Sequence, residues 1–279
     1  MSRGKSLLMG AFILLGLLAL AGCNQRQQKA DGVTISTTTS YLEAVVHDLM
    51  GDEVRVVRLA EPGSCPGHFD IRPSQVEELR HCRALLRFDF QKSLDAKIAG
   101  NGVNGPAVVE VAIRGGMCVP ASYLNACRQV AGQMVKLGLM SGAAADGRIQ
   151  SITERLDALG RNITNRVVQA GLAGLPVIAS AHQRDFCEWL GLKVVATFRA
   201  ADTAGIGEIE DAISAGKLAQ IKLVVANLPE GRRTADALAQ RLKARMVVFE
   251  NFPVARGGKV SFDEMLLANA GALVGTSGK

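Results

Sequence analysis

From Val33 onward, short apolar runs rich in β-branched residues alternate with longer stretches whose apolar residues recur every three or four positions. The first pattern predicts buried strands and the second predicts amphipathic helices. The strands predicted in the first half are Val33–Ser36, Val54–Leu59, Ala84–Phe88 and Val108–Ala112, and the helices are Tyr41–Met50, Ser74–Arg80 and Gln91–Ile98. Such alternation favours a parallel sheet covered by helices.

The middle of the chain has a helical pattern only. Helices are predicted at Leu124–Leu139 and Arg148–Ala170, with a break at Gly142–Gly147. Alternation then resumes, with strands at Val177–Ser180, Val194–Phe198, Leu223–Ala226 and Met246–Phe249, and helices at Arg184–Leu190, Ile206–Ala215, Thr234–Lys243 and Phe262–Leu273. The sequence therefore predicts an α/β protein of two Rossmann-like lobes, residues 33–122 and 176–279, joined by a long helical linker at residues 123–175.

The first residues follow a different pattern. Arg3 and Lys5 precede the almost entirely apolar run Leu7–Ala21, whose length is typical of a secretion signal and short for a membrane span. The run ends in Leu-Ala-Gly-Cys, which resembles a bacterial lipobox. Residues 1–22 are then a lipoprotein signal peptide, Cys23 is the lipidated new N-terminus, and residues 23–32 are a polar tether. The alternative is an uncleaved anchor. We expect an exported protein, lipid-anchored to a bacterial membrane on its periplasmic or cell-surface side.

Composition narrows the class of protein. Of the 279 residues, 48% are hydrophobic and 21% are charged, which excludes a disordered chain and a collagen-like repeat. The net charge of +6 is small and scattered, and aromatic residues make up only 4%. Because nucleic-acid binding needs a basic patch and often stacking aromatics, we expect no nucleic-acid partner.

Candidate chemistry lies directly after the predicted strands, where open α/β sheets bind ligands. Four strand ends, two from each lobe, carry metal-ligand side chains: Cys65 and His68 after the second strand, Cys118 after the fourth, His182 after the fifth and Glu250 after the eighth. Imidazole, thiol and carboxylate are the ligands of a four-coordinate metal site. A single histidine at a strand end is ordinarily a hydrogen-bonded structural residue, so the shared position of these groups is what indicates a metal.

Several motifs beyond the leader agree with this interpretation. They are Val33-Thr-Ile-Ser-Thr-Thr, Gly51-Asp-Glu-Val54, Pro66-Gly-His68, and the block Val177-Ile-Ala-Ser-Ala-His182 that leads to Gly191-Leu192. With the lipobox, they resemble the metal-binding class of ABC-transporter substrate-binding lipoproteins, which carry zinc, manganese or iron. The resemblance covers almost the whole chain after the leader. In that family a long helix joins two lobes that hold a metal between them.

The resemblance implies the ligands residue by residue. His68 matches the family's first histidine, although Gly67 interrupts the usual pattern. His182 matches the ligand that opens the second lobe, and Glu250 falls where a carboxylate, usually aspartate, closes the site. The remaining ligand is normally a histidine shortly before an Asn-Ala, and the corresponding residue here is Cys118.

The cysteines leave two interpretations open. Apart from Cys23 there are five, an odd number in an oxidising compartment: Cys65, Cys82, Cys118, Cys127 and Cys187. A Cys118 thiolate would complete the site and favour Zn²⁺ over Mn²⁺ or Fe²⁺, with Cys65 as a second thiolate candidate. Alternatively, Cys65 and Cys118 form a disulfide. The other three cysteines fall within predicted helices, as small buried residues, and His47 and His81 are expected at the surface.

The function implied is that of an extracytoplasmic solute-binding lipoprotein. It would capture a divalent transition metal, Zn²⁺ before Mn²⁺ or Fe²⁺, between two lobes and deliver it to an ABC-transporter permease in the membrane. The alternative is a degenerate family member with the Cys65–Cys118 disulfide, which binds another ligand or no metal. The sequence has no GxxxxGK[ST] loop and no HExxH motif, so we expect neither ATP hydrolysis nor zinc-dependent catalysis.

Overall fold

Two parallel four-stranded sheets with equivalent strand orders, β2-β1-β3-β4 and β6-β5-β7-β8, form the framework of the protein. The computed structural model describes residues 33–52, 54–64, 71–99, 105–200, 202–203 and 205–275. The first sheet contains β1 (Thr34–Thr37), β2 (Arg55–Arg58), β3 (Ala84–Phe88) and β4 (Ala107–Val111), and the second contains β5 (Pro176–Ser180), β6 (Lys193–Phe198), β7 (Leu223–Asn227) and β8 (Arg245–Phe249). The predicted fold class is therefore confirmed.

Helices cover these sheets, as parallel sheets require. They are α2 (Ser40–Met50), α3 (Pro73–Leu79), α4 (Ser93–Ala99), α5 (Pro120–Lys136), α6 (Gly142–Gln169), α7 (Arg184–Trp189), α8 (Ile206–Leu218), α9 (Arg233–Leu242) and α10 (Phe262–Val274). Short 3₁₀ turns follow three strands: η1 (Asp89–Gln91), η2 (Ala181–Gln183) and η3 (Leu228–Glu230). Every residue of the inner strands β3 and β7 is buried, which explains their continuous apolar sequence.

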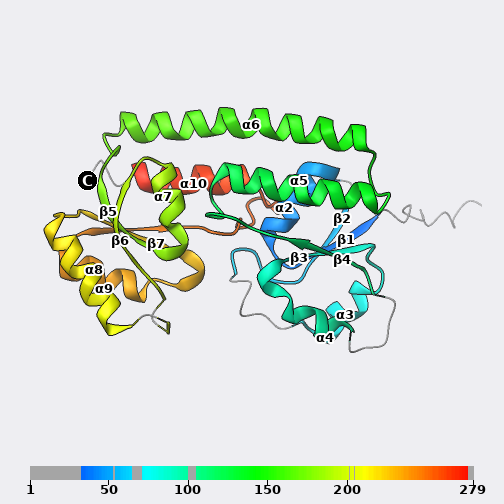
Figure 1. Cartoon of the computed structure of the whole chain (residues 1–279), viewed down its shortest axis with the longest axis horizontal. Coiled ribbons are helices and arrows are strands. Elements are labelled where there is room, and N and C mark those ends of the chain that lie inside the picture. The colour runs from blue at the N-terminus through cyan, green and yellow to red at the C-terminus, as the bar shows by residue number, and fades with distance from the viewer. Residues whose placement is uncertain are drawn as a thin grey trace, which may run out of the picture. The chain divides into compact units, whose positions relative to one another are not determined.

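The helix α6 connects the two halves of the chain. It packs on α2 and α5, which accompany the first sheet, and on α10, which follows the last strand of the second, and Figure 1 shows it passing over both groups. Its 28 residues correspond to a length of about 42 Å at about 1.5 Å per residue. The hydrophobic core beneath it is one continuous cluster that includes residues of both sheets, from Ile35 to Leu273.

The predicted break between the two middle helices is displaced in the structure. We expected it at Gly142–Gly147, but these residues form the first turns of α6. The helix begins there because the Ser141 hydroxyl accepts a hydrogen bond from the Ala144 amide at 3.2 Å. The chain turns before α6 begins, at Gly138, whose φ of +68° is readily adopted by glycine. The predicted lobe boundaries stay predictions.

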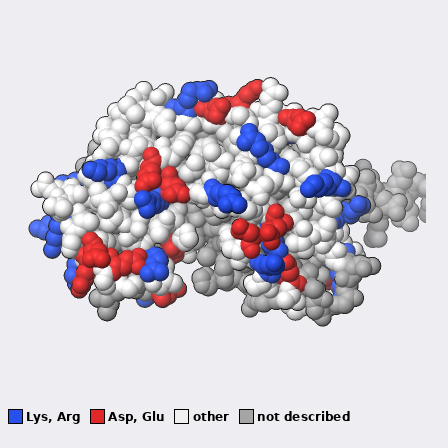
Figure 2. Space-filling view, in the orientation of Figure 1, with Lys and Arg blue, Asp and Glu red and all other residues white. Residues whose placement is uncertain are grey.

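The surface carries charges of both signs. On the face drawn in Figure 2, the basic and acidic side chains of the described residues are interspersed, and many are ion-paired, such as Arg199 with Glu208 and Arg184 with Glu188. Among the described residues, no helix combines the length and the apolar character needed to cross a membrane.

Candidate metal centre

The loop that carries Cys118 lies against the second half of the chain. It leads from β4 to α5, where Pro120 occupies the first turn of the helix. A Cβ atom added to Gly116 would stand 2.8 Å from the Cβ of Asp185, at the start of α7. Only a glycine backbone fits so close to this helix. The approach brings the strand end of the first sheet that carries Cys118 next to the segment of the second sheet that carries His182.

The Cys118 side chain is buried in this contact, with only 1% of its surface exposed. Its Sγ lies 3.1 Å from the main-chain oxygen of Glu250 and 3.5 Å from Oδ1 of Asn251, and the thiol donates to these acceptors. Burial raises the pKa of the Cys118 thiol far above its ordinary value, because charge is disfavoured away from water. In this arrangement Cys118 is a protonated donor that ties two strand ends together.

The main-chain carbonyl of Glu250 accepts hydrogen bonds from two further side chains. Nε2 of Gln183, in the turn after β5, lies 3.3 Å away, and Nδ2 of Asn269, in α10, lies 2.9 Å away. Asn269 also accepts from the Glu250 amide at 2.8 Å, and Gln183 donates to Asn227 at the end of β7 at 3.0 Å. These side chains are almost completely buried. Three strand ends of the second sheet are thus joined to the Cys118 loop by one polar network.

The carboxylate of Glu250 is paired with Arg256. Nη1 of Arg256 lies 3.2 Å from Oε2 of Glu250, and Nη2 contacts Oε1 more closely. The Glu250 side chain is 15% exposed and that of Arg256 is 36% exposed. Because both carboxylate oxygens are engaged, this is a bidentate ion pair, the strongest geometry for arginine and a carboxylate.

His182 lies at the end of β5 in the turn η2, with 65% of its side chain exposed. Its Nε2 is 3.5 Å from Oε1 of Glu230, in the turn η3 after β7. The other oxygen of Glu230 accepts from the Ser180 hydroxyl at 2.5 Å. The imidazole is therefore accessible to a solute at the strand ends, and it already has a carboxylate beside it.

The loop after β2 approaches the same region. Gly63 has φ +77°, and a Cβ atom there would stand 3.2 Å from Cγ2 of Val254, four residues beyond Glu250. The two predicted ligands further along this loop, Cys65 and His68, lie outside the described residues, as does Cys23. The described part of the loop nevertheless heads toward the segment after β8.

Within the described residues, no three His, Cys, Asp or Glu side chains come together as a metal-binding group. Cys118 and Glu250 are adjacent through thiol and main chain, and His182 is paired with Glu230. The four-ligand set predicted from the sequence therefore stays a prediction.

The cysteines correct two expectations. Cys118 carries a free thiol, as do Cys82, Cys127 and Cys187, so the structure does not contain the Cys65–Cys118 disulfide that we considered. All four are buried. Cys82 lies just beyond the end of α3 and not within a helix, where its thiol donates to the Glu78 carbonyl at 3.4 Å.

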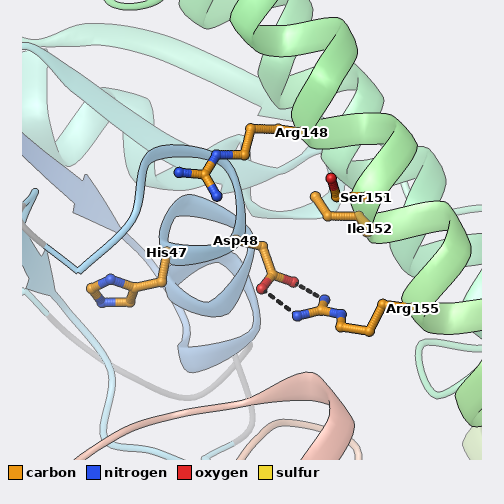
Figure 3. Close-up of a pocket in the computed structure, with 6 residues that line it drawn as sticks. All are labelled: His47, Asp48, Arg148, Ser151, Ile152 and Arg155. Atoms are coloured by element: carbon orange, nitrogen blue, oxygen red, sulfur yellow. Dashed lines mark hydrogen bonds and ion pairs between the residues drawn. The ribbon is translucent and has the colours of Figure 1, made fainter.

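A pocket of about 180 Å³ lies elsewhere, between α2 and α6. In Figure 3, Asp48 of α2 is joined to Arg155 of α6, while Arg148 and His47 extend from the two helices on one side of this pair. His47, expected at the surface, is only 27% exposed. Since α2 runs back from the end of β1, this pocket is at the amino-terminal edge of the strands, away from the predicted ligands.

The residues of the strand-end network that were missed from the sequence include Gln183, Glu230 and Arg256. Gln183 and Glu230 each follow a strand, so the rule that found His182 could have found them. Arg256 begins the sequence Arg-Gly-Gly-Lys, whose glycine pair is typical of a tight hairpin turn, and that was the available signal.

Two parallel four-stranded sheets and a long helix that packs against helices of both are the two-lobe architecture of ZnuA-like solute-binding proteins. Residues 35–276 match the family model described as zinc-uptake complex component A, periplasmic, or ZnuA, and the chain belongs to this family. It is accordingly the periplasmic metal-binding component of a metal-uptake ABC transporter, and it is not an enzyme.

Solved structures with the same fold support the architecture. A Mn-bound periplasmic metal-binding protein from Candidatus Liberibacter asiaticus is 12% identical, covering 88% of this chain and 99% of its own, with a TM-score of 0.73. Its Cd-bound form is 11% identical at the same coverage and TM-score. A crystal structure of ZnuA is 13% identical over 88% of this chain and 98% of its own, with a TM-score of 0.69. No curated protein sequence matches the chain.

Proposed function

We propose that this protein captures Zn²⁺ between its two sheets and hands it to the permease of an ABC importer. The proposed ligands are His68, Cys118, His182 and Glu250, with Cys65 as a second thiolate candidate. The observation that carries the proposal is the contact between Cys118 and the Glu250 main chain, because it joins strand ends from both sheets at one point. Ligands contributed by two lobes are what a capturing and releasing protein requires.

The donor chemistry supports zinc as the cargo. Thiolate and imidazole suit Zn²⁺, whereas Mn²⁺ prefers carboxylates, carbonyls and water. Binding would require the Cys118 thiol to lose its proton and leave the Glu250 carbonyl, so capture should release protons. The solved neighbours named above hold Mn and Cd, and the proposed preference of this chain for Zn²⁺ is tested by comparing the two ions directly.

The first experiment measures metal binding by the full chain. Isothermal titration with Zn²⁺ and with Mn²⁺, and the shift in melting temperature that each ion causes, should rank Zn²⁺ first. In His182→Ala, the zinc-induced rise in melting temperature should disappear. A full thermal shift in that variant would remove His182 from the site, and the absence of any metal binding by the unmodified protein would refute the proposed cargo.

A second experiment asks whether Cys118 is a ligand. Cys118→Ser keeps a hydroxyl donor for the Glu250 carbonyl and removes the soft sulfur ligand. Zinc affinity should fall by more than the roughly 10–100-fold that loss of an outer-shell partner costs. The matched control is Cys82→Ser, since Cys82 is also a buried thiol that donates to a main-chain carbonyl. Unchanged affinity in Cys118→Ser would leave a site of His68, His182 and Glu250.

Membrane attachment forms the last part of the proposal. We infer that residues 1–22 are removed and that lipid on Cys23 holds the protein at the membrane surface beside the permease. Cys23→Ser should move the protein from the membrane fraction to the soluble periplasmic fraction. Retention of that variant at the membrane would contradict lipidation at Cys23.

A further inference from the structure

The ion pair between Glu250 and Arg256 stands at the proposed cargo site. Glu250 is one of the proposed ligands, and both of its carboxylate oxygens contact the Arg256 guanidinium. The carboxylate is mostly shielded from solvent, with 15% of the side chain exposed. A charge pair in such a place is screened less than a surface pair. Anything cationic that approaches Glu250 meets a carboxylate already occupied by another cation.

The backbone around Arg256 holds it in this position. Arg256 and Lys259 form an isolated antiparallel bridge, with hydrogen bonds of 2.8 Å and 3.0 Å between their main chains. The two residues between them, Gly257 and Gly258, have φ of +56° and +80°, as a two-residue hairpin turn of type I′ requires. The turn folds the chain back after β8, so that the residue at position 256 faces the residue at position 250.

The other end of the turn is tied to the first half of the chain. Nζ of Lys259 lies 2.5 Å from Oδ2 of Asp52, in the segment between α2 and β2. Both side chains are largely exposed, so this pair contributes little energy. It nevertheless connects the turn that carries Arg256 to the first half of the chain.

We propose that Arg256 is a tethered competitor of the metal cargo for Glu250, an inference that rests on the proposed function. Arg256 engages both oxygens of Glu250, so a divalent ion must displace at least one of these contacts, and the two cations repel each other at such a short separation. Cargo capture then requires the Arg256 side chain to move into solvent, which its exposure and long aliphatic stem allow. When the ion leaves, Arg256 returns to Glu250. The competitor lowers the affinity for the ion and speeds its release.

The test compares zinc binding by the unmodified full chain and by Arg256→Gln. Removing the competing charge should raise zinc affinity about tenfold, as expected for loss of a partly buried ion pair, and should slow the transfer of zinc to an added chelator. Arg199→Gln is the matched control, because Arg199 forms a comparable pair with Glu208 away from the site. It should leave zinc affinity unchanged.

A double-mutant cycle assigns the effect to the pair. In a Glu250→Gln background, Arg256→Gln should no longer raise the zinc affinity, because the carboxylate for which Arg256 and the ion compete is absent. Arg256→Lys, which keeps a charge but loses the bidentate geometry, should bind zinc with an affinity between those of the unmodified protein and Arg256→Gln. This second variant keeps the test decisive should the glutamine variant fold poorly.

The outcomes separate this inference from the proposed function. Equal or weaker zinc binding by both Arg256 variants, with normal binding by the unmodified protein, would overturn the role of Arg256 and leave the cargo assignment standing. Failure of the unmodified protein to bind any divalent metal would instead overturn the proposed function. A persistent affinity gain of Arg256→Gln in the Glu250→Gln background would also refute the competition, since the effect would then not pass through Glu250.

Discussion

The two sheets are joined at two junctions of opposite character. On the helix side, Phe262 of α10 stacks on Tyr123 of α5 with ring centroids 3.9 Å apart and meets Tyr41 of α2 edge-on at 5.9 Å. All three rings are buried. At the strand ends, the junction is polar instead and consists of a thiol, amides and ion pairs around Glu250.

This contrast indicates where the protein can change its arrangement. Packed rings lose contact with any displacement, and no other partner replaces what they lose. Hydrogen bonds and ion pairs can be exchanged for water or for a metal ion at small net cost. We therefore expect the helix side to act as a fixed hinge region and the strand ends to be where cargo alters the contacts.

The largest effect should come from the helix-side rings. Phe262→Ala would remove the contacts to both tyrosines and leave a cavity, lowering the free energy of unfolding by about 3–5 kcal/mol. Chemical denaturation measures this change. The control is Phe90→Ala, because Phe90 is 58% exposed, and its cost should stay below about 1 kcal/mol. Equal costs for the two variants would contradict the contribution of the buried ring stack to stability.

The ion pairs of Arg155, beside these rings, should have the next largest effect on the free energy of unfolding. Arg155 of α6 binds Asp48 of α2 with two nitrogens and lies 3.4 Å from Asp263 of α10. Arg155→Met would leave two half-buried carboxylates without this partner and should cost about 2 kcal/mol of unfolding free energy. Arg184→Met, which breaks an exposed pair with Glu188, should cost less than about 0.5 kcal/mol. A smaller loss in the Arg155 variant would show that α6 is held by packing alone.

The strand-end junction can be probed through its close backbone approach. Gly116→Ala would place a Cβ atom 2.8 Å from Asp185 and should cost about 1–2 kcal/mol of stability. Gly132→Ala makes the matched comparison, since nothing lies within 4 Å of a Cβ atom there, and it should stabilise α5 by about 0.5–1 kcal/mol. Thermal melting of both variants should give shifts of opposite sign. Shifts of the same sign would refute the close approach.

The smallest effect should be a pH dependence from His47. The Glu43 carboxylate, 3.9 Å from Nε2 of His47, raises the pKa of His47 above its ordinary value of 6.5, against the opposing effect of burial. A raised folded-state pKa means that the protonated form stabilises the fold. The contribution, about 0.5 kcal/mol for such a pair, is fully present below the ordinary pKa and is lost as the pH rises through the raised one. His47→Gln should therefore be destabilising at acidic pH and nearly neutral at alkaline pH, measured by denaturation across that range. The reverse trend would contradict this assignment.

Much of the fold was predictable because the strands follow a simple rule. The fully buried strand β3 was predicted with its observed bounds, Ala84–Phe88, since a strand covered on both faces is a continuous apolar run. The break between α5 and α6 was misplaced because glycines occur on both sides of the true turn. Of Gly138, Gly142 and Gly147, only Gly138 adopts a positive φ, and nothing lies within 4 Å of an added Cβ atom at any of the three, so no close contact distinguishes the glycine at the turn.

The candidate site was less predictable than the fold. Strand topology indicated which residues lie at the facing edges, and Cys118 does reach the end of β8. Topology does not indicate the direction of a side chain, so the donation of the Cys118 thiol to a main-chain oxygen could not be foreseen. Arg256 was missed for a related reason: its partnership with Glu250 depends on a hairpin turn, and periodic patterns carry no information about such turns.

Cys118, Gln183 and Asn269 donate to the main-chain oxygen of residue 250, not to its side chain. A substitution there leaves the acceptor in place, so the scaffold that unites the strand ends should survive a change from glutamate to aspartate, glutamine or histidine. Residue 250 consequently offers a single codon at which the preference for one metal over another can be altered while the architecture stays constant.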